Sequence, residues 1–213
     1  ILVNVPSFTL RAYSFGKLVM ESPVIVGKPG RQTPIFETNV VGVKFHPTWS
    51  PPPSILKKDI LPTLGTEKSF AASHGLHISY DGSPIDEIDI TEEMRYSGKL
   101  RFIQSPGDDN ALGVLKFETD NDQNIYLHDT NSRKLFVKSQ RALSSGCVRV
   151  QEWKKLAAWV QDIEESGIDK KLEKSGTRIE KTEKVPVSIV YSLADKKSDK
   201  WMYFPNIYGR NIN

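Results

Sequence analysis

The chain has 213 residues, of which 38% are hydrophobic and 26% are charged, and its formal net charge is +3 at pH 7. This length and composition suit one domain with a full-sized core. No apolar run approaches the roughly 20 residues that a bilayer crossing requires. The charge forms no basic stripe with interleaved aromatic residues, so we expect no nucleic acid partner. A single cysteine excludes an internal disulfide framework.

The first part of the chain predicts a run of β-strands. Segments rich in β-branched and aromatic residues alternate with glycine and proline turns, and we expect strands over 2–5, 9–13, 18–26 and 40–45. Because the sequence opens on a strand already under way, we expect upstream sequence in the parent protein. The lack of a leader sequence here therefore carries no information about compartment.

A proline-dense loop over 47–53 follows, and it contains Trp49. Fixed proline dihedrals stiffen such a loop, which suits either a ligand-binding wall or a rigid connector that exposes one tryptophan. A helix is expected over 54–61, with Ser54 as its N-cap and Pro62 as its stop. Residues from about 66 to 103 are less apolar and more acidic, and we interpret them as an insertion that acts as a lid.

The second half of the chain returns to a strand pattern and then changes to a helix. Strands are expected over 112–118 and 124–129. Apolar residues at helical spacing predict one helix over 151–166, with Gly167 as its stop. The chain is expected to end with a hairpin that pairs 185–192 with 201–204.

Cys147 is the candidate nucleophile. It follows Gly146 in the run Ser-Ser-Gly-Cys-Val-Arg, just ahead of the predicted helix, and His128 ends the preceding strand. Because a thiol is a strong nucleophile only as a thiolate, we expect His128 to ionise Cys147. Taken alone, each residue also has a structural reading: Cys147 as a small buried hydrophobe and His128 as a hydrogen-bonded core histidine.

The residues around this pair have expected roles as well. Successive strand residues face opposite sides, so Asp129 is expected to face away from His128, whose ring would instead donate to a backbone carbonyl. The amides of residues 145–147 are candidate donors for an oxyanion. Arg149 either binds a substrate carboxylate or braces the turn.

Other catalytic patterns fit less well. His74 and His77 form an H-x-x-H pair, but no further ligand is placed to complete a zinc site, so we expect no metal. No G-x-S-x-G elbow surrounds Ser144 or Ser145, which excludes the common serine hydrolase motif. A papain-like order is excluded because the histidine here precedes the cysteine.

Together these motifs resemble the L,D-transpeptidase (YkuD-like) catalytic domain, over nearly the whole chain. The core of the likeness is His128 followed by the S-S-G-C-V-R run, where many members have S-H-G-C. Further segments that resemble the family lie at 26–36, 47–55, 104–113 and 207–210. With the inserted lid, the chain is most similar to the large YcbB-type enterobacterial members.

The resemblance implies a mainly β, α+β fold: a β-sandwich-like core with short packed helices, forming one catalytic domain over 1–213 with the insertion at about 66–103. It implies that Cys147 attacks the third residue of a peptidoglycan stem tetrapeptide, releases D-Ala and forms a thioester. An amine of a second stem then resolves this thioester to give a 3→3 cross-link. The implied catalytic and substrate-binding residues are Cys147, His128, Gly146 and Ser145, and Tyr126, Ser144, Arg149 and Trp49, respectively.

The same resemblance implies an enzyme of cell wall organisation and cell shape in the bacterial periplasm, without metal or cofactor and acylated by carbapenems. Three alternatives stay open. Water could resolve the thioester, which would make the protein an L,D-carboxypeptidase, or a lipoprotein lysine could be the acceptor. The non-enzymatic alternative is a wall-binding module with a structural cysteine.

Overall fold

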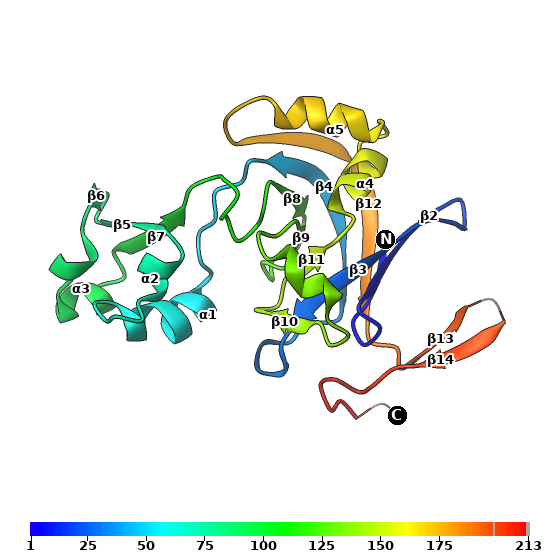
Figure 1. The fold of residues 1–213 in the computed structure, drawn as a ribbon, viewed down its shortest axis with the longest axis horizontal. Helices are drawn as coiled ribbons and strands as arrows, with labels where there is room; N and C mark the ends of the chain where they lie inside the picture. Colours follow the sequence, from blue (N-terminus) through cyan, green and yellow to red (C-terminus); the bar gives the residue numbers. More distant parts are fainter. Residues whose placement is uncertain (198, 212–213) are drawn as a thin grey trace.

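The computed structural model describes residues 1–197 and 199–211, and most of its strands belong to one large mixed sheet (Figure 1). These strands are β1 (Leu2–Asn4), β2 (Thr9–Ser14), β3 (Lys17–Gly27), β4 (Phe36–Phe45), β8 (Leu115–Thr119), β9 (Leu127–His128), β10 (Ala142–Ser144), β11 (Val148–Val150) and β12 (Arg178–Val190). Their order is β10-β3-β11-β9-β8-β4-β12-β1-β2. Because β2 also pairs with β3, the sheet closes on itself around its inner face.

The register at the centre of this sheet decides which side chains face the core. β11 runs parallel to β9, with Val148 opposite Leu127 and Arg149 opposite His128. β9 runs antiparallel to β8, with Phe117 opposite Leu127. Because side chains alternate between the two faces of a sheet, the buried row of Val148, Leu127 and Phe117 faces inward. The neighbouring row, which includes His128 and Arg149, faces the other way.

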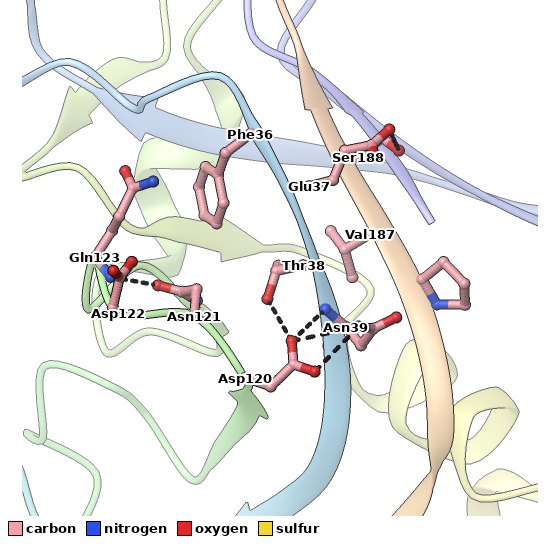
Figure 2. Close-up of a pocket in the computed structure, with 11 residues that line it drawn as sticks. Phe36, Glu37, Thr38, Asn39, Asp120, Asn121, Asp122, Gln123, Val187 and Ser188 are labelled. Atoms are coloured by element: carbon pink, nitrogen blue, oxygen red, sulfur yellow. Dashed lines mark hydrogen bonds between the residues drawn. The ribbon is translucent and has the colours of Figure 1, made fainter.

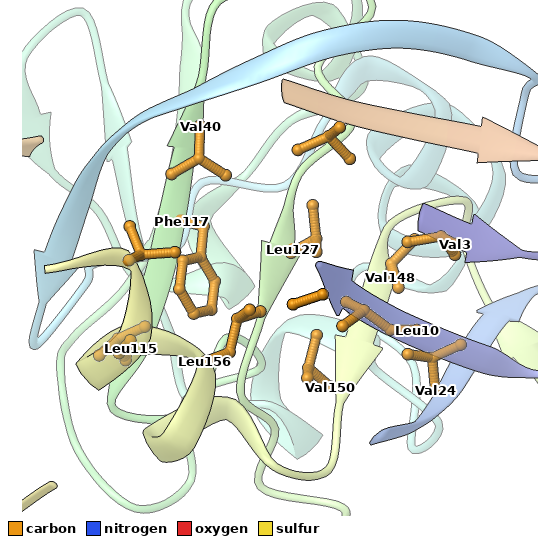
Figure 3. Packing of buried hydrophobic residues seen from close by; sticks show 14 of the residues in the cluster. Val3, Leu10, Val24, Val40, Leu115, Phe117, Leu127, Val148, Val150 and Leu156 are labelled. Atoms are coloured by element: carbon orange, nitrogen blue, oxygen red, sulfur yellow. The ribbon is translucent and has the colours of Figure 1, made fainter. Parts of the chain in front are cut away.

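The inward face is filled by aliphatic and aromatic side chains from several strands and from two helices, and Figure 3 shows part of this cluster. Members that Figure 3 labels are Val3, Leu10, Val24, Val40, Leu115, Phe117, Leu127, Val148, Val150 and Leu156. All of these side chains are at most 1% exposed. Burying one such side chain stabilises the fold by roughly 1.5–3 kcal/mol, so the outward row of β9 and β11 stands on a rigid support.

The helical segment after β11 is two helices, α4 (Trp153–Val160) and α5 (Glu165–Leu172), so the predicted single helix over 151–166 is wrong. Asp162 adopts the left-handed region with a φ of 51° and ends the first helix. Gly167 lies inside α5, where a Cβ would stand 3.1 Å from the nearest side-chain atom. This glycine therefore permits close packing against Ile163, in the connection between the two helices, and does not end a helix.

The helical run after the proline loop also differs from its prediction. It consists of α1 (Pro53–Ile55), a turn of π-helix η2 (Leu56–Ile60) and a 3₁₀ turn η3 (Leu61–Thr63). Ser54 is inside the first turn and is not the N-cap. Pro62 is also inside, within η3, because proline needs no amide partner in a first helical turn.

Residues from the proline loop onward build a second, smaller body beside the large sheet (Figure 1). Besides the helical run above, its elements are α2 (Phe70–Ser73), β5 (Leu76–Tyr80), β6 (Ser83–Pro84), η4 (Glu87–Asp89), α3 (Glu92–Tyr96) and β7 (Leu100–Gln104). The strands form a separate sheet of order β6-β5-β7. The body has its own buried cluster of Trp49, Ile55, Ile60, Leu64, Ala71, Ile90, Leu100, Phe102 and Leu112.

Three shorter features complete the fold. Single 3₁₀ turns are η1 (Pro29–Arg31) and η5 (Arg133–Val137). The predicted terminal hairpin is wrong, because β12 pairs with β4 and β1, and the hairpin is formed by β13 (Ala194–Lys197) and β14 (Lys200–Tyr203). Strands dominate the described chain and its helices are short, which confirms the predicted mainly β, α+β class.

Candidate active site

Four of the predicted site residues lie on the outward face of two neighbouring parallel strands. Arg149 of β11 stands opposite His128 of β9. Two residues earlier in each chain segment, Cys147 and Tyr126 continue the same register, and the Val148 amide donates to the Tyr126 carbonyl at 3.1 Å. Because residues two apart share a strand face, these four side chains leave the sheet on the same side. The sulfur of Cys147 and the imidazole of His128 are therefore diagonal neighbours on one face of the strand pair.

These side chains form the floor of a cavity of about 200 Å³. The floor residues are Tyr126, His128, Ser144, Ser145, Cys147 and Arg149, and the remaining walls come from Trp49, Pro52, Ile55, Phe70, His74, Ala111 and Leu112. Several of the wall residues belong to the second body. The cavity is therefore made at the junction of the two bodies, and it contains every predicted site residue except Gly146.

The turn before Cys147 is held by hydrogen bonds of its own residues. The Ser144 hydroxyl donates to the Cys147 carbonyl at 2.6 Å and accepts from the Gly146 amide at 3.1 Å. Gly146 has a φ of +125°, a conformation that L side chains rarely adopt. Among the described residues, the amides of Ser145 and Cys147 have no hydrogen-bond acceptor, so they and not the Gly146 amide are free to bind an oxyanion.

The loop between β3 and β4 braces this turn from the other side. Thr33 Oγ1 donates to the Gly146 carbonyl at 2.7 Å and accepts from the Gly27 amide at 2.9 Å. Tyr208, near the C-terminus, accepts from the Thr33 amide at 3.2 Å and donates to the Gly27 carbonyl at 2.6 Å. The segments at 26–36 and 207–210, which the sequence analysis singled out, are therefore tied to the Cys147 turn.

His128 is buried and electrostatically disfavoured as a cation. Its pKa is lowered to about 3, first by burial and then by the positive charges of Arg149 and Lys116. The backbone of Asp129 and of Leu112 opposes this shift. The Nδ1 atom makes no hydrogen bond of normal geometry, but the ring lies next to the backbone of Asp129 and Leu112.

Asp129 faces away from the site, as strand alternation predicts. Its carboxylate is fully buried. It accepts from Arg133 Nη2 at 2.7 Å and from the Val114 amide at 3.0 Å. A Cβ on Gly113 would stand 2.2 Å from the same carboxylate, so only glycine fits at that position. Asp129 therefore fastens the approach to β9 and does not orient His128.

The surroundings of Cys147 favour the protonated thiol. Its thiol donates to the Asn124 carbonyl at 3.6 Å and not to an imidazole nitrogen. Burial raises its pKa above the ordinary 9.0, while Tyr126 and the cations Lys116 and Arg149 pull the pKa down more weakly. Burial disfavours both the thiolate and the imidazolium, so ionisation of Cys147 by His128 stays a prediction.

Tyr126 touches both members of this pair. Its ring packs edge-on against the His128 ring with 5.8 Å between centroids, and Lys116 Nζ lies over the Tyr126 ring at 4.2 Å. Burial, followed by the negative charge of the Cys147 thiolate, raises the pKa of the phenol, while a hydrogen bond from Trp49 lowers it. Tyr126 therefore stays protonated, and its hydroxyl can donate to the sulfur.

Arg149 carries a guanidinium nitrogen with no partner. Its Nε is buried and makes no hydrogen bond, and burial lowers the pKa of the side chain. A buried cation with a free donor favours an anionic ligand, since arginine forks readily onto carboxylates. The alternative expectation, that Arg149 braces the turn, requires a side-chain hydrogen bond that Nε does not make.

The L,D-transpeptidase catalytic domain (YkuD) family model matches residues 1–189. The chain belongs to this family. A curated protein of Haemophilus influenzae, named "Putative L,D-transpeptidase", is 34% identical over 223 residues, which covers 100% of this chain and 45% of that protein. The chain thus spans less than half the length of the relative.

Solved L,D-transpeptidases are more distant in sequence. One from Mycobacterium smegmatis is 11% identical with a TM-score of 0.44, over 89% of this chain and 57% of that one. L,D-transpeptidase 1 of Mycobacterium tuberculosis is 14% identical with a TM-score of 0.39, over 89% and 59% of the two chains.

Sequence reasoning missed two residues that this L,D-transpeptidase domain places at the site. His74, which was set aside, lines the cavity together with Phe70. Arg31 donates to Ser145 Oγ at 3.0 Å and forms an ion pair with Asp59 of η2. The H-x-x-H pair and the segment at 26–36 contain these residues, but neither pattern places them beside Cys147, because both come from segments remote along the chain.

A larger hollow lies elsewhere on the domain, at the edge where β4, β12 and the turn after β8 meet (Figure 2). Asp120 there accepts from the Asn39 amide at 2.8 Å and from Thr38 Oγ1 at 3.0 Å. These bonds lower the pKa of its carboxyl and fasten the turn to β4. The hollow contains neither the thiol nor a histidine.

Among the described residues, no cluster of three or more His, Cys, Asp or Glu side chains could hold a metal ion. No helix in the described ranges is long and apolar enough to cross a bilayer.

Proposed function

We propose that this domain catalyses peptidoglycan 3→3 cross-linking through a thioester on Cys147. One observation carries the proposal: a chain of the L,D-transpeptidase family brings its only thiol and a buried imidazole to the same face of two paired strands, in one cavity. A nucleophile with a neighbouring base is the arrangement that covalent acyl transfer requires.

In the proposed acylation step, Sγ leaves the Asn124 carbonyl and attacks the carbonyl carbon of the third stem residue. His128 takes the thiol proton as the C–S bond forms and passes it to the departing D-Ala nitrogen as the C–N bond breaks. Because His128 and Cys147 are both neutral at rest, no ion pair has to be separated first. The amides of Ser145 and Cys147 face the developing oxyanion.

The remaining predicted residues receive binding roles in this proposal. Arg149, whose Nε is unpartnered, pairs with a carboxylate of the donor stem. Tyr126 and Trp49 form a wall against the stem, and the Tyr126 hydroxyl stabilises the thiolate when it leaves. Ser144 acts through the turn, because its hydroxyl is already committed to Gly146 and Cys147.

In the second step an amine of another stem attacks the thioester. Water would compete for the same intermediate, and exclusion of water from the cavity favours the amine. We propose that the inserted segment at about 66–103, as part of one catalytic domain over 1–213, is the cover. The alternative is an L,D-carboxypeptidase in which water wins. Both readings place the enzyme at the peptidoglycan of the bacterial periplasm and make carbapenems acylating inhibitors.

The test is incubation with purified tetrapeptide muropeptides, followed by separation of the products. Cross-linked dimers support the transpeptidase, whereas tripeptides without dimers support the carboxypeptidase. Cys147→Ala is expected to abolish both products, and His128→Ala to come close to doing so. His77→Gln is the matched control, because His77 is exposed and lines a different hollow. Product formation by Cys147→Ala at the wild-type rate would overturn the proposal.

A further inference from the structure

His74 stands in the same cavity as Cys147 but comes from the second body. It is the C-cap residue of α2, and it lines the cavity opposite the floor residues of the large sheet. The residue is exposed, so it stands at the rim, where a second substrate can arrive from solvent. The proposed acylation step, which uses His128 and Cys147, leaves this imidazole without a role.

Contacts with Phe70 and Ser73 fix the orientation of the His74 ring. It stacks on Phe70 with 3.8 Å between centroids and an interplanar angle of 5°. Its Nδ1 lies 3.0 Å from the Phe70 carbonyl and 3.0 Å from Ser73 Oγ. These contacts hold the imidazole plane at the rim before any ligand is present.

The same contacts assign the tautomer. A carbonyl oxygen can only accept, and the Ser73 hydroxyl already donates to the Phe70 carbonyl at 3.1 Å. Nδ1 of His74 must therefore carry the hydrogen. In the neutral ring the lone pair is then on Nε2, which makes no hydrogen bond to a described residue. The structure thus presents an unoccupied basic nitrogen at the rim.

We propose that His74 is the proton acceptor for the incoming amine in the second step, an assignment that rests on the proposed transpeptidase function. An acceptor ammonium has no lone pair and cannot attack until it loses a proton. Nε2 of His74 takes that proton, and the neutral amine attacks the thioester carbon.

The protons and electrons of this step balance between the two histidines. The C–N bond forms, the C–S bond breaks, and the electron pair of that bond leaves with Sγ. His128 takes the remaining extra proton from the nitrogen and gives it to the sulfur, which restores the thiol. The exposed His74 ring releases its own proton to solvent. His128 thereby returns a proton to the Cys147 sulfur, and His74 removes the first proton from the acceptor ammonium.

The experiment measures two quantities for the wild type, His74→Gln and His74→Phe: the rate of Cys147 acylation by the tetrapeptide donor, and the ratio of dimer to tripeptide product. Glutamine keeps polarity and phenylalanine keeps the stacking on Phe70, but neither side chain can take a proton. Because positioned general bases contribute about a hundredfold or more, the ratio should fall at least tenfold further than the acylation rate. His77→Gln should change neither quantity.

A second acceptor separates proton transfer from a merely structural role. Methoxyamine is a weak base that is already neutral at the assay pH, so its reaction with the thioester should be nearly the same in the His74 variants and in the wild type. An equal loss with both acceptors, or unchanged dimer yield in both variants, overturns the His74 assignment alone. A wild-type chain that forms the thioester but no dimers overturns the transpeptidase proposal itself.

Discussion

The pKa values of Cys147 and His128, the two candidate reactive residues, are both shifted toward the neutral form. Burial raises the pKa of Cys147 and lowers that of His128. The cations Arg149 and Lys116 shift both groups in one direction, toward deprotonation. In the proposed mechanism, the proton of the Cys147 thiol is therefore expected to move to His128 only when a substrate is bound.

The pH dependence of thiol alkylation tests this resting state. Because burial raises the pKa of Cys147, its rate of reaction with iodoacetamide should keep rising with pH and reach half-maximum above the ordinary value of 9.0. Tyr126→Phe should move that midpoint further up, since it removes a hydrogen bond to the thiolate. Cys147→Ser gives the blank. A plateau already reached at neutral pH would reveal an ion pair and contradict the neutral state.

Acid stability tests the His128 environment. Its folded pKa of about 3 lies below the ordinary 6.5. Between these values the unfolded chain binds a proton that the folded chain does not, so the free energy of unfolding falls as pH falls below 6.5. One such group amounts to about 2 kcal/mol between about pH 7.5 and about pH 5.

Urea unfolding of the wild type and His128→Gln at both pH values measures this difference. The variant should lose about 2 kcal/mol less than the wild type on acidification. The exposed His77→Gln should behave like the wild type. Parallel losses in wild type and His128→Gln would show that His128 is not held neutral by the fold.

At the scale of elements, the site is made by register. The parallel pairing of β9 and β11 puts Cys147, Tyr126, His128 and Arg149 on one face, and the inward partners of these residues anchor the strands in the core. The opposite wall comes from the second body, whose buried cluster shares no residue with that of the large sheet. The two walls can therefore be separated experimentally.

Replacing residues 66–103 by a short linker tests this division. The core of the large sheet has no member in that range, so the deletion variant should keep its strand circular dichroism and unfold cooperatively. The second cluster loses Ala71, Ile90, Leu100 and Phe102. Without its cover the thioester should meet more water, and the dimer-to-tripeptide ratio should fall about tenfold. An unfolded variant would mean that the large sheet depends on the segment.

At the scale of the whole molecule, one ion pair links the two bodies at the site. Arg31, between β3 and β4, forks onto Asp59 of η2 with N–O distances of 2.5 and 2.9 Å. The Arg31 side chain is only 9% exposed, and the same guanidinium donates to Ser145. Charge-assisted bidentate pairs of this kind fix geometry as well as adding stability.

A double-mutant cycle with Arg31→Gln and Asp59→Asn measures that link. We expect a coupling energy of about 1–2 kcal/mol from urea unfolding, because the pair is bidentate and largely buried. The exposed pair of Lys99 and Asp81, treated in the same way with Lys99→Gln and Asp81→Asn, should give a clearly smaller coupling, because water screens exposed charges. Equal coupling energies in both cycles would show that burial and bidentate geometry do not strengthen the Arg31–Asp59 pair.

Periodicity identified most strands of the large sheet and the direction of Asp129 away from His128, because both follow from local alternation. Periodicity did not predict the break between α4 and α5, because the left-handed backbone of Asp162 interrupts an otherwise helical apolar spacing. Strand order, the Arg31 contact with Ser145 and the place of His74 depend on long-range packing, which no local pattern specifies. The burial that raises the pKa of Cys147 also depends on the whole cavity and has no local sequence pattern.

Intact-protein mass spectrometry after exposure to a tetrapeptide donor or a carbapenem tests the central claim that Cys147 forms an acyl-enzyme. We expect one covalent adduct on the wild-type protein, which peptide digestion maps to Cys147 and which is absent from Cys147→Ala. We also expect that excess acceptor amine removes the tetrapeptide-derived adduct. A folded wild-type protein that forms no adduct with either reagent, or an adduct that persists in Cys147→Ala, would contradict this claim.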